Sequence, residues 1–462
     1  MTPERLEEIL LRARLPRPAS GGIEITGTDP ALASRYPAAE AAACALALAA
    51  NSAARLHEQR GGPPQDVRVS VEAAAQTLLG FFFLRSDRDL DLARQITPLT
   101  DLYADARGRF IHLHGGFPHL AQGILDILDS APERGAIARA VHQRDAFELE
   151  EEIAEKGFCA GVVRGHEEWA SHPQGLAMGT QPAVEILKIG EAEPRPLPPL
   201  GAQPLAGLRV LDLTRVLAGP TCARTLADHG AEVLRVGAPH LPSVEPFVIE
   251  TGRGKRNAFL DLRKPEDARE LGVLSTGADV FCQGYRAGSL EKRGFGAEQL
   301  AEQSPGLIYV SINCYGHLGP WRARAGWEQL AQSVSGIAQG EGGAESPRLI
   351  PAAATDYTTG YLAAYGVMEA LRRRAREGGT WHVRASLVQT AMWFTRLGDG
   401  LDPEAARGLG DAESRLMESD THWGKLRSLG PVVEMSATRP GSGIPPSPLG
   451  THPPRWLEPS EQ

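Results

Sequence analysis

The sequence predicts an α/β protein built on a doubly wound parallel sheet, with a second, smaller α/β domain. Short apolar runs that suit buried parallel strands alternate with helical patterns between residues 204 and 398. A proline-rich segment at 196–203 separates this part from another alternation of strands and helices upstream. The composition, 42% hydrophobic and 23% charged, is typical of a globular chain with a sizeable core.

The first strand–helix–strand unit spans residues 204–236. Leu208–Leu213 predicts a buried strand, Pro220 is expected at the first helical position, and Gly230 can take the left-handed cap before the next strand. Ligands bind beyond the carboxyl ends of such strands, so the loop at 214–219 is expected to face one. The loop lacks GxGxxG, which argues against a nicotinamide dinucleotide, and an ordinary strand-to-helix turn is the alternative.

The alternation continues to residue 398. We expect a basic loop at 251–257, strands ending at Leu262 and spanning 278–282, 307–312 and 382–387, and helices at 263–276, around Lys292 and Arg293, and through Ala363, Val367 and Leu371. Beyond residue 399 the periodicity fades, and the tail is rich in proline and glycine. We expect that tail to wrap the surface, with 430–435 able to add a strand.

The N-terminal part repeats a portion of the large domain. VRVSVEAAAQ at 67–76 aligns with VRASLVQTAM at 383–392, and a helix precedes each copy. Two copies with a long period favour partial gene duplication over a repeat array, and two unrelated helix–strand pairs are the alternative.

Between the repeats, a smaller α/β module is expected. Strands at 110–114 and 161–163 and helices at 118–129 and 147–156 would build it, followed by an exposed segment at 166–169. The predicted division is a partial copy of the large domain, a small domain, a linker, the large domain and a C-terminal extension, at 1–95, 96–195, 196–203, 204–398 and 399–462.

Composition excludes several classes of protein. The net charge of -9, from 48 basic and 57 acidic residues, argues against a general nucleic-acid binder. Five scattered cysteines without a CxxC pair indicate neither a disulfide framework nor a metal site. The longest apolar run, Leu78–Leu84, is too short to cross a bilayer, and the N-terminus lacks a long apolar segment. A cytoplasmic enzyme is the simplest expectation.

From Pro204 onward the chain resembles the family III CoA-transferases, which include formyl-CoA and carnitine CoA-transferases and α-methylacyl-CoA racemases. The matching stretches are PLAGLRVLDLTRVLAGP, GAEVLRV, GRGKRNAFLDLRKPE, VFCQGYRAGSLEKRG, LIYVSINCYGHLGP, WEQLAQSVSG and ATDYTTGYLAAYGVMEALRRRAREGG. Residues 96–195 resemble the family's small domain more weakly, chiefly in YADARGRFIHLHGGFP. In ordinary members that domain follows the catalytic aspartate, whereas here it precedes the large domain.

The resemblance implies a Rossmann-like domain that binds CoA as a substrate, with no tightly bound cofactor. It places Val216 and Leu217 near the thioester, Leu260, Leu262 and Arg263 beside the adenine, Gly284 and Tyr285 where the family has Asn-Phe, and Arg293 where an arginine meets phosphate. Arginine suits this role because it holds phosphate through paired, charge-assisted hydrogen bonds. A solvated surface charge is the alternative for each arginine.

Asp356, in ATDYTTG, aligns with the family's nucleophile. The resemblance implies that its carboxylate attacks a donor thioester, forms a mixed anhydride, and takes CoA back as an aspartyl-CoA thioester before an acceptor acid collects it. A place at a helix start favours the charged form. The alternative is a plain N-cap.

Some positions depart from the family pattern. Leu217 replaces a glutamine aimed at the reacting carbonyl in some members, which disfavours formyl and oxalyl substrates. Gly284, Ala287 and Gly237 replace a common asparagine, proline and glutamate, so CoA affinity could be altered.

The resulting expectation is a CoA-transferase that moves CoA between an acyl-CoA and a carboxylic acid, as an interlocked homodimer. An acyl-CoA racemase is the alternative enzyme, but Trp327 stands where that branch has a histidine, and an indole cannot accept a proton. His317 is a candidate substitute base, and Glu328 reads as a helix-start carboxylate. A CoA-binding subunit without activity is the alternative from another class.

Overall fold

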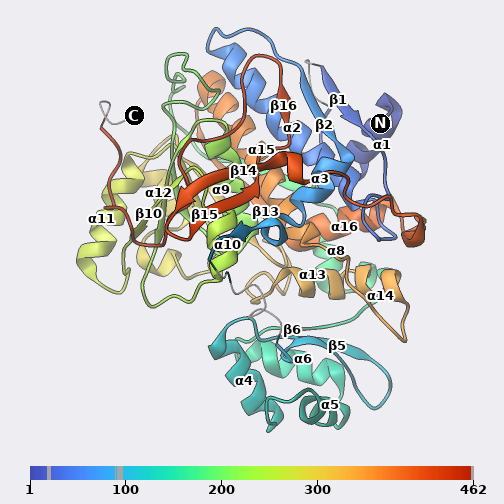
Figure 1. Cartoon of the computed structure of the whole chain (residues 1–462). Coiled ribbons are helices and arrows are strands. Elements are labelled where there is room, and N and C mark those ends of the chain that lie inside the picture. Colours follow the sequence, from blue (N-terminus) through green and yellow to red (C-terminus); the bar gives the residue numbers. More distant parts are fainter. Residues whose placement is uncertain (18–21, 89, 91–96, 459–462) are drawn as a thin grey trace.

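A seven-stranded sheet forms the centre of the molecule (Figure 1). In this computed structural model, which describes residues 1–17, 22–88, 90 and 97–458, the strand order is β10-β9-β8-β11-β12-β13-β7. The strands are β7 Val184–Gly190, β8 Arg209–Leu213, β9 Glu232–Gly237, β10 Lys255–Phe259, β11 Val280–Gln283, β12 Ile308–Asn313 and β13 Thr380–Ser386. All neighbouring pairs are parallel except β13 with β7, which is antiparallel. The chain runs outward from β8 to β10 and then returns to β11, so the predicted doubly wound sheet is confirmed.

Both faces of this sheet are covered, which explains its near-continuous apolar strands. Along β8, Val210 joins one hydrophobic core and Leu211 the opposite one, and alternate residues of the neighbouring strands divide in the same way. The helices of the sheet region are α9 Ala218–Asp228, α10 Glu245–Glu250, α11 Pro265–Thr276, α12 Ala297–Gln303, α13 Glu328–Val334, α14 Ile337–Gly342, α15 Ala354–Glu377 and α16 Leu387–Leu397.

Three local expectations need correction. Pro220 is the third residue of α9 and not the first. The helix expected around Arg293 is only a 3₁₀ turn, η3 Glu291–Arg293, because Gly294 adopts the left-handed conformation (φ +86°) and stops it. The expected basic loop at 251–257 is partly strand, since β10 begins at Lys255, whose ammonium group is buried against Asp212.

The N-terminal part packs against the large sheet region. It comprises α1 Pro3–Ala13, β1 Ile23–Thr26, α2 Ala38–Gln59, β2 Val67–Ser70, α3 Val71–Thr77 and η1 Gly80–Phe83. The two helices related by the sequence repeat, α2 and α15, lie against each other. The strands that follow them also correspond, because β2 and β13 each run straight into a helix whose N-cap is a serine, Ser70 or Ser386. The repeat is therefore present in local structure as well as in sequence.

A separate antiparallel sheet stands at the bottom of Figure 1. It contains β4 Thr100–Ala104, β5 Phe110–His114 and β6 Ala160–Val162, with α4 Pro118–Leu128, α5 Arg134–His142 and α6 Ala146–Glu155 around a core of its own. We call residues 97–163 the small unit. Two helices, α7 His166–Ser171 and α8 Pro173–Gly179, then lead to β7.

The predicted domain division stays a prediction. Its boundary at 95/96 lies outside the described residues, and β7, within the range 96–195, pairs with the large sheet. The expectation of an exposed segment at 166–169 fails for Trp169, which is 1% exposed because its indole packs on His172 and Trp321.

The C-terminal part returns across the molecule. After η4 Pro403–Ala405 and η5 Glu413–Arg415, β14 Leu416–Thr421 and β15 Gly424–Leu429 form a hairpin beside β3 Arg85–Ser86, and β16 Glu434–Met435 joins β2. The final stretch runs along β10, where His452 accepts a hydrogen bond from the backbone of Asn257. Among the described residues, no helix has both the length and the apolar character needed to cross a membrane.

Removing the guanidinium group of Arg374 should destabilise the fold. It is fully buried on α15, and donates to Asp279 at 3.0 Å and to the carbonyl of Gly306 at 3.1 Å. We expect Arg374→Met to cost about 3 kcal/mol of unfolding free energy, because the buried acceptors lose their donor. The exposed neighbour in Arg376→Met is the control and should change stability by about 0.5 kcal/mol or less. Urea unfolding followed by circular dichroism measures both, and equal midpoints would contradict the assignment.

Candidate functional site

A cavity of about 610 Å³ lies beyond the carboxyl ends of β8, β11 and β12. The large sheet region supplies the loop 214–219 and the segments that follow the other two strands. The small unit supplies the facing wall, at 117–120 and 156–159. Both walls come from one chain, so the small unit closes the cavity over its own large sheet.

A buried ion pair fixes the loop of this cavity at both ends. The ammonium group of Lys255 lies 2.9 Å from Asp212 and donates to the carbonyl of Pro220 at 2.8 Å. The other carboxylate oxygen of Asp212 accepts hydrogen bonds from the backbone and hydroxyl of Thr214. Because Asp212 and Lys255 are both 0% exposed, this network holds the turn without help from water.

The loop is strained where it meets the cavity. Val216 has φ +68°, a left-handed conformation that a β-branched residue rarely adopts. Such strain persists only where surrounding structure enforces it, and it gathers at binding and catalytic sites. Helix α15 also approaches this loop closely at Gly360. A Cβ atom at Gly360 would lie 2.6 Å from the carbonyl oxygen of Ala218, so only glycine lets α15 pack against the loop.

Asp356 lies in the first turn of α15, 7% exposed and in the cavity wall. The backbone N–H of Ala218 lies toward its carboxyl group and acts to lower its pKa. Burial raises the pKa of Asp356 well above its ordinary value, and the neighbouring Glu328 carboxyl raises it further. The helix start was expected to favour the charged form of Asp356, but burial outweighs that effect.

Glu328 forms an acid pair with Asp356. It is the first residue of α13, 5% exposed, and accepts hydrogen bonds from the backbone and hydroxyl of Thr355 and from Gln332. Burial raises the pKa of Glu328 to about 7 despite these donors. Two adjacent buried carboxyl groups do not ionise independently, so near neutral pH the pair retains a proton. The sequence had predicted only that Glu328 is a carboxylate at the start of a helix.

The predicted site residues fall into two groups. Val216, Leu217, Gly284, Tyr285 and Asp356 line the cavity together. Outside its lining lie Leu260, Leu262, Arg263 and Arg293.

The second group lies at the neighbouring end of β10. Leu260 is buried in the core against which Leu262 and Tyr285 also pack, and Arg293 donates to the carbonyl of Leu262 at 3.1 Å. Arg263 is paired with Asp261. These side chains are thus close to one another, and Tyr285 connects them to the cavity.

Several lining residues escaped the sequence interpretation. Cationic groups come from Lys156, Arg215, Arg286 and Arg324, and aromatic rings from Phe117, Phe158 and Trp327. Trp327 stacks on His114 of the small unit with ring centroids 4.3 Å apart. Arg215 lay in the loop expected to face a ligand and could have been singled out. The contributions of the small unit had no such signal, because only tertiary structure brings them to the sheet.

The cavity combines acidic, apolar and cationic side chains. It offers two buried carboxyl groups, an apolar loop and scattered cations suited to phosphate. Among the described residues, no group of three or more histidine, cysteine, aspartate or glutamate side chains is arranged to hold a metal ion.

Comparison with known proteins finds a family and several relatives that resemble part of this chain. Residues 205–399 match the family model described as CoA-transferase family III. The acetyl-coenzyme A transferase nodX of Hypoxylon pulicicidum is 32% identical over 322 residues, which cover 64% of this chain and 54% of that protein. The succinyl-CoA–L-malate CoA-transferase beta subunit of Chloroflexus aurantiacus is 36% identical over 214 residues, 43% of this chain and 52% of that protein.

Among solved structures, a CAIB/BAIF family protein from Brucella suis is 30% identical, with a TM-score of 0.39. The match covers 48% of this chain and 65% of that one. The chain spans about half the length of the curated relatives it matches.

The acid pair should make the stability of the protein depend on pH. Glu328 ordinarily has a pKa near 4.5, and the folded protein raises it to about 7. The folded state therefore binds more protons than the unfolded state across this window, and stability falls as the pH rises from about 4.5 to about 7. We expect Glu328→Gln to weaken this fall, because one of the two acids is gone.

Thermal unfolding between pH 4 and 8 measures this effect as the difference between wild type and variant. Glu302→Gln, which alters an exposed carboxylate on α12, is the control for a change of charge alone. Parallel pH profiles for wild type and Glu328→Gln would contradict the proposed proton sharing.

Proposed function

We propose that this protein, whose residues 205–399 belong to CoA-transferase family III, moves CoA between an acyl-CoA thioester and a carboxylic acid. The observation that carries the proposal is Asp356, a buried carboxyl group in the wall of a cavity of about 610 Å³ at the switch point of the sheet. The names of the relatives support the same reaction class.

CoA is proposed to enter along the carboxyl ends of the strands. Its adenine would border Leu260, Leu262 and Arg263, with Arg293 toward a phosphate, and its pantetheine arm would follow Gly284 and Tyr285. The thioester would then reach Val216 and Leu217, next to Asp356. The two groups of predicted residues support this path, since they lie side by side and Tyr285 joins them.

The chemistry begins with Asp356 as nucleophile. A carboxylate oxygen attacks the thioester carbonyl carbon and the C–S bond breaks. CoA departs as a thiolate, and the acyl group and Asp356 are joined as a mixed anhydride. The thiolate then attacks the aspartyl carbonyl and releases the donor acid, giving an aspartyl-CoA thioester. An acceptor carboxylate attacks this thioester, which forms a second anhydride and releases the CoA thiolate. The thiolate then attacks the acyl carbon of the acceptor, which gives the new acyl-CoA and frees the carboxylate of Asp356.

Glu328 is proposed to hold the proton that Asp356 must lose. Both carboxyl groups have raised pKa values, and only one needs to ionise. The N–H of Ala218 favours the charge on Asp356. Glu328 is then a positioning residue, because it acts on the nucleophile and not on the substrate.

The racemase alternative has less support. Trp327 lines the cavity where a histidine base would be needed, and its indole cannot accept a proton. His317, the candidate substitute, lies outside the cavity lining, with one ring nitrogen 2.8 Å from the hydroxyl of Ser311. His119 is the histidine in the described lining, and it comes from the small unit.

The interlocked homodimer implied by the resemblance also stays a proposal. Since one chain lines both walls of the cavity, we expect each chain to carry a complete site. Light scattering after size-exclusion chromatography measures the assembly.

Asp356→Asn should abolish transfer, because an amide cannot form the anhydride. We expect a loss of about 10³-fold or more in kcat with an unchanged Kd for CoA. The test incubates the wild type with a panel of acyl-CoAs, traps the intermediate with hydroxylamine, and locates the adduct by mass spectrometry. Asp126→Asn, at an exposed position of the small unit, is the control.

Full activity of Asp356→Asn would refute the nucleophile assignment. CoA binding without any adduct from any donor would instead favour the inactive CoA-binding subunit. Deuterium uptake at C2 of a 2-methylacyl-CoA, dependent on Asp356 and independent of an acceptor acid, would favour the racemase.

A further inference from the structure

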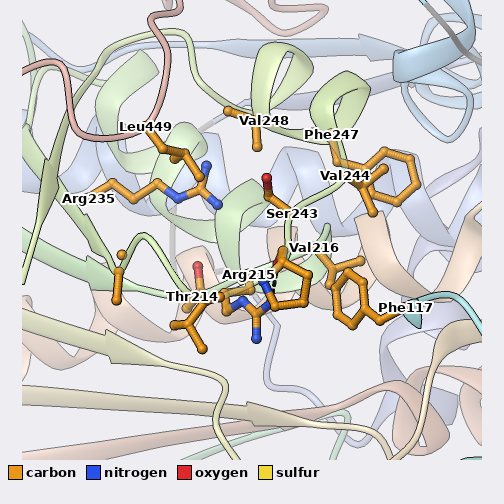
Figure 2. Close-up of a pocket in the computed structure, with 14 residues that line it drawn as sticks. Phe117, Thr214, Arg215, Val216, Arg235, Ser243, Val244, Phe247, Val248 and Leu449 are labelled. Atoms are coloured by element: carbon orange, nitrogen blue, oxygen red, sulfur yellow. Dashed lines mark hydrogen bonds between the residues drawn. The ribbon is translucent and has the colours of Figure 1, made fainter. Parts of the chain in front are cut away.

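A small pocket adjoins the main cavity at the ends of β8 and β9 (Figure 2). The two share Phe117, Thr214, Arg215, Val216 and Leu241 in their linings. The rest of the small pocket comes from β9, from the segment leading into α10, and from Leu449 of the C-terminal tail. We call it the Arg235 pocket.

The charged side chains of this lining are both cationic. They are Arg215 and Arg235, and no acidic residue accompanies them among the described lining residues. Arg235 is only 4% exposed, and its Nη1 is buried without a hydrogen-bond partner in the described part of the chain. Figure 2 shows its side chain extending from β9 toward Ser243.

The carboxylate opposite Arg235 is already engaged. Asp212 occupies the paired position on the adjacent strand, but Lys255 binds one of its oxygens and Thr214 the other. Arg215 donates to the backbone carbonyl of Pro242, a neutral acceptor, and its guanidinium lies 5.1 Å from the ring of Phe117. The positive charge of the two arginines is therefore not neutralised within the pocket.

An uncompensated buried guanidinium is costly, and native proteins pair such groups or bind an anion with them. The free volume of the pocket, about 20 Å³, is little more than one water molecule needs. It cannot hold a whole nucleotide or acyl-CoA. Since it adjoins the main cavity, it fits one anionic group at the end of a molecule bound there.

We propose that the Arg235 pocket binds a terminal oxyanion of the substrate, with Arg235 as the residue that selects for it. This inference rests on the proposed CoA-transferase function. The oxyanion has two sources: the far carboxylate of a dicarboxylic acyl group or acceptor, or a phosphate of CoA itself. Both accept the same charge-assisted hydrogen bonds from a guanidinium.

Two donors of equal chain length separate these sources. Succinyl-CoA ends in a carboxylate and butyryl-CoA in a methyl group. We expect Arg235→Met to lower kcat/KM for succinyl-CoA about 10- to 100-fold more than for butyryl-CoA, the size of one or two lost hydrogen bonds to a charge. Arg269→Met, on the exposed face of α11, is the matched control and should keep the wild-type ratio.

An equal fall for both donors, with weaker binding of free CoA, would assign the oxyanion to a CoA phosphate. No change in either donor would overturn the proposal. Should Arg235→Met fail to fold, Ser243→Ala offers a milder test at the same pocket, with a smaller shift of the ratio in the same direction.

A binding measurement keeps this inference separate from the proposed function. Calorimetric titration of the wild type and Arg235→Met with succinate, and separately with inorganic phosphate, needs no turnover. We expect the wild type to bind one of these anions, and Arg235→Met to weaken that affinity at least about 10-fold. This result would support the proposed anion site even in a protein without transferase activity. The protein could prove to be an active transferase in which Arg235→Met changes neither the donor ratio nor the binding of anions. That result would refute the proposed anion site and leave the proposed function intact.

Discussion

The geometry of the cavity depends on the buried ion pair between Asp212 and Lys255. It joins the end of β8 to the start of β10, and its remaining hydrogen bonds hold Thr214 and Pro220. The loop between these two residues thereby presents the backbone N–H of Ala218 to the nucleophile. A buried pair of this kind is weak evidence for stability, because desolvating two charges offsets their attraction. Its value here is geometric.

The same pair determines the charge on both sides of the loop. Asp212 attracts Arg235 as well as Lys255, but it carries a single negative charge, so positive charge remains beside the cavity. On the other side of the loop, burial is the largest cause of the raised pKa values of Asp356 and Glu328. No cationic side chain that the structure describes acts to lower the pKa of either carboxyl group. The Arg235 pocket is thus suited to an anion, whereas the acid pair lies where a neutral thioester is proposed to bind.

Local patterns predicted the parallel sheet and the loop after its first strand, because strand and helix periodicity act over a few residues. The family resemblance, and not periodicity, singled out Asp356. They missed the partner of Lys255 and the burial of Trp169, since both depend on residues distant in sequence. The hairpin of β14 and β15 was missed because its strands are mostly polar, without the apolar alternation that marks a half-buried strand. The small-unit wall of the cavity was likewise beyond local patterns.

The internal repeat holds Asp356, the proposed nucleophile, in place by packing. Asp356 stands on α15, which is buried along most of its length between α9 and α2, the helix from the other repeat. A nucleophile on a rigid, packed helix keeps its place relative to the loop, whereas a side chain on a free loop would not. The N-terminal copy, although it has alanine near the position of the nucleophile, therefore contributes to the site by packing. Its helix α2 is therefore part of the framework that positions the proposed site, as are the strands beside the cavity.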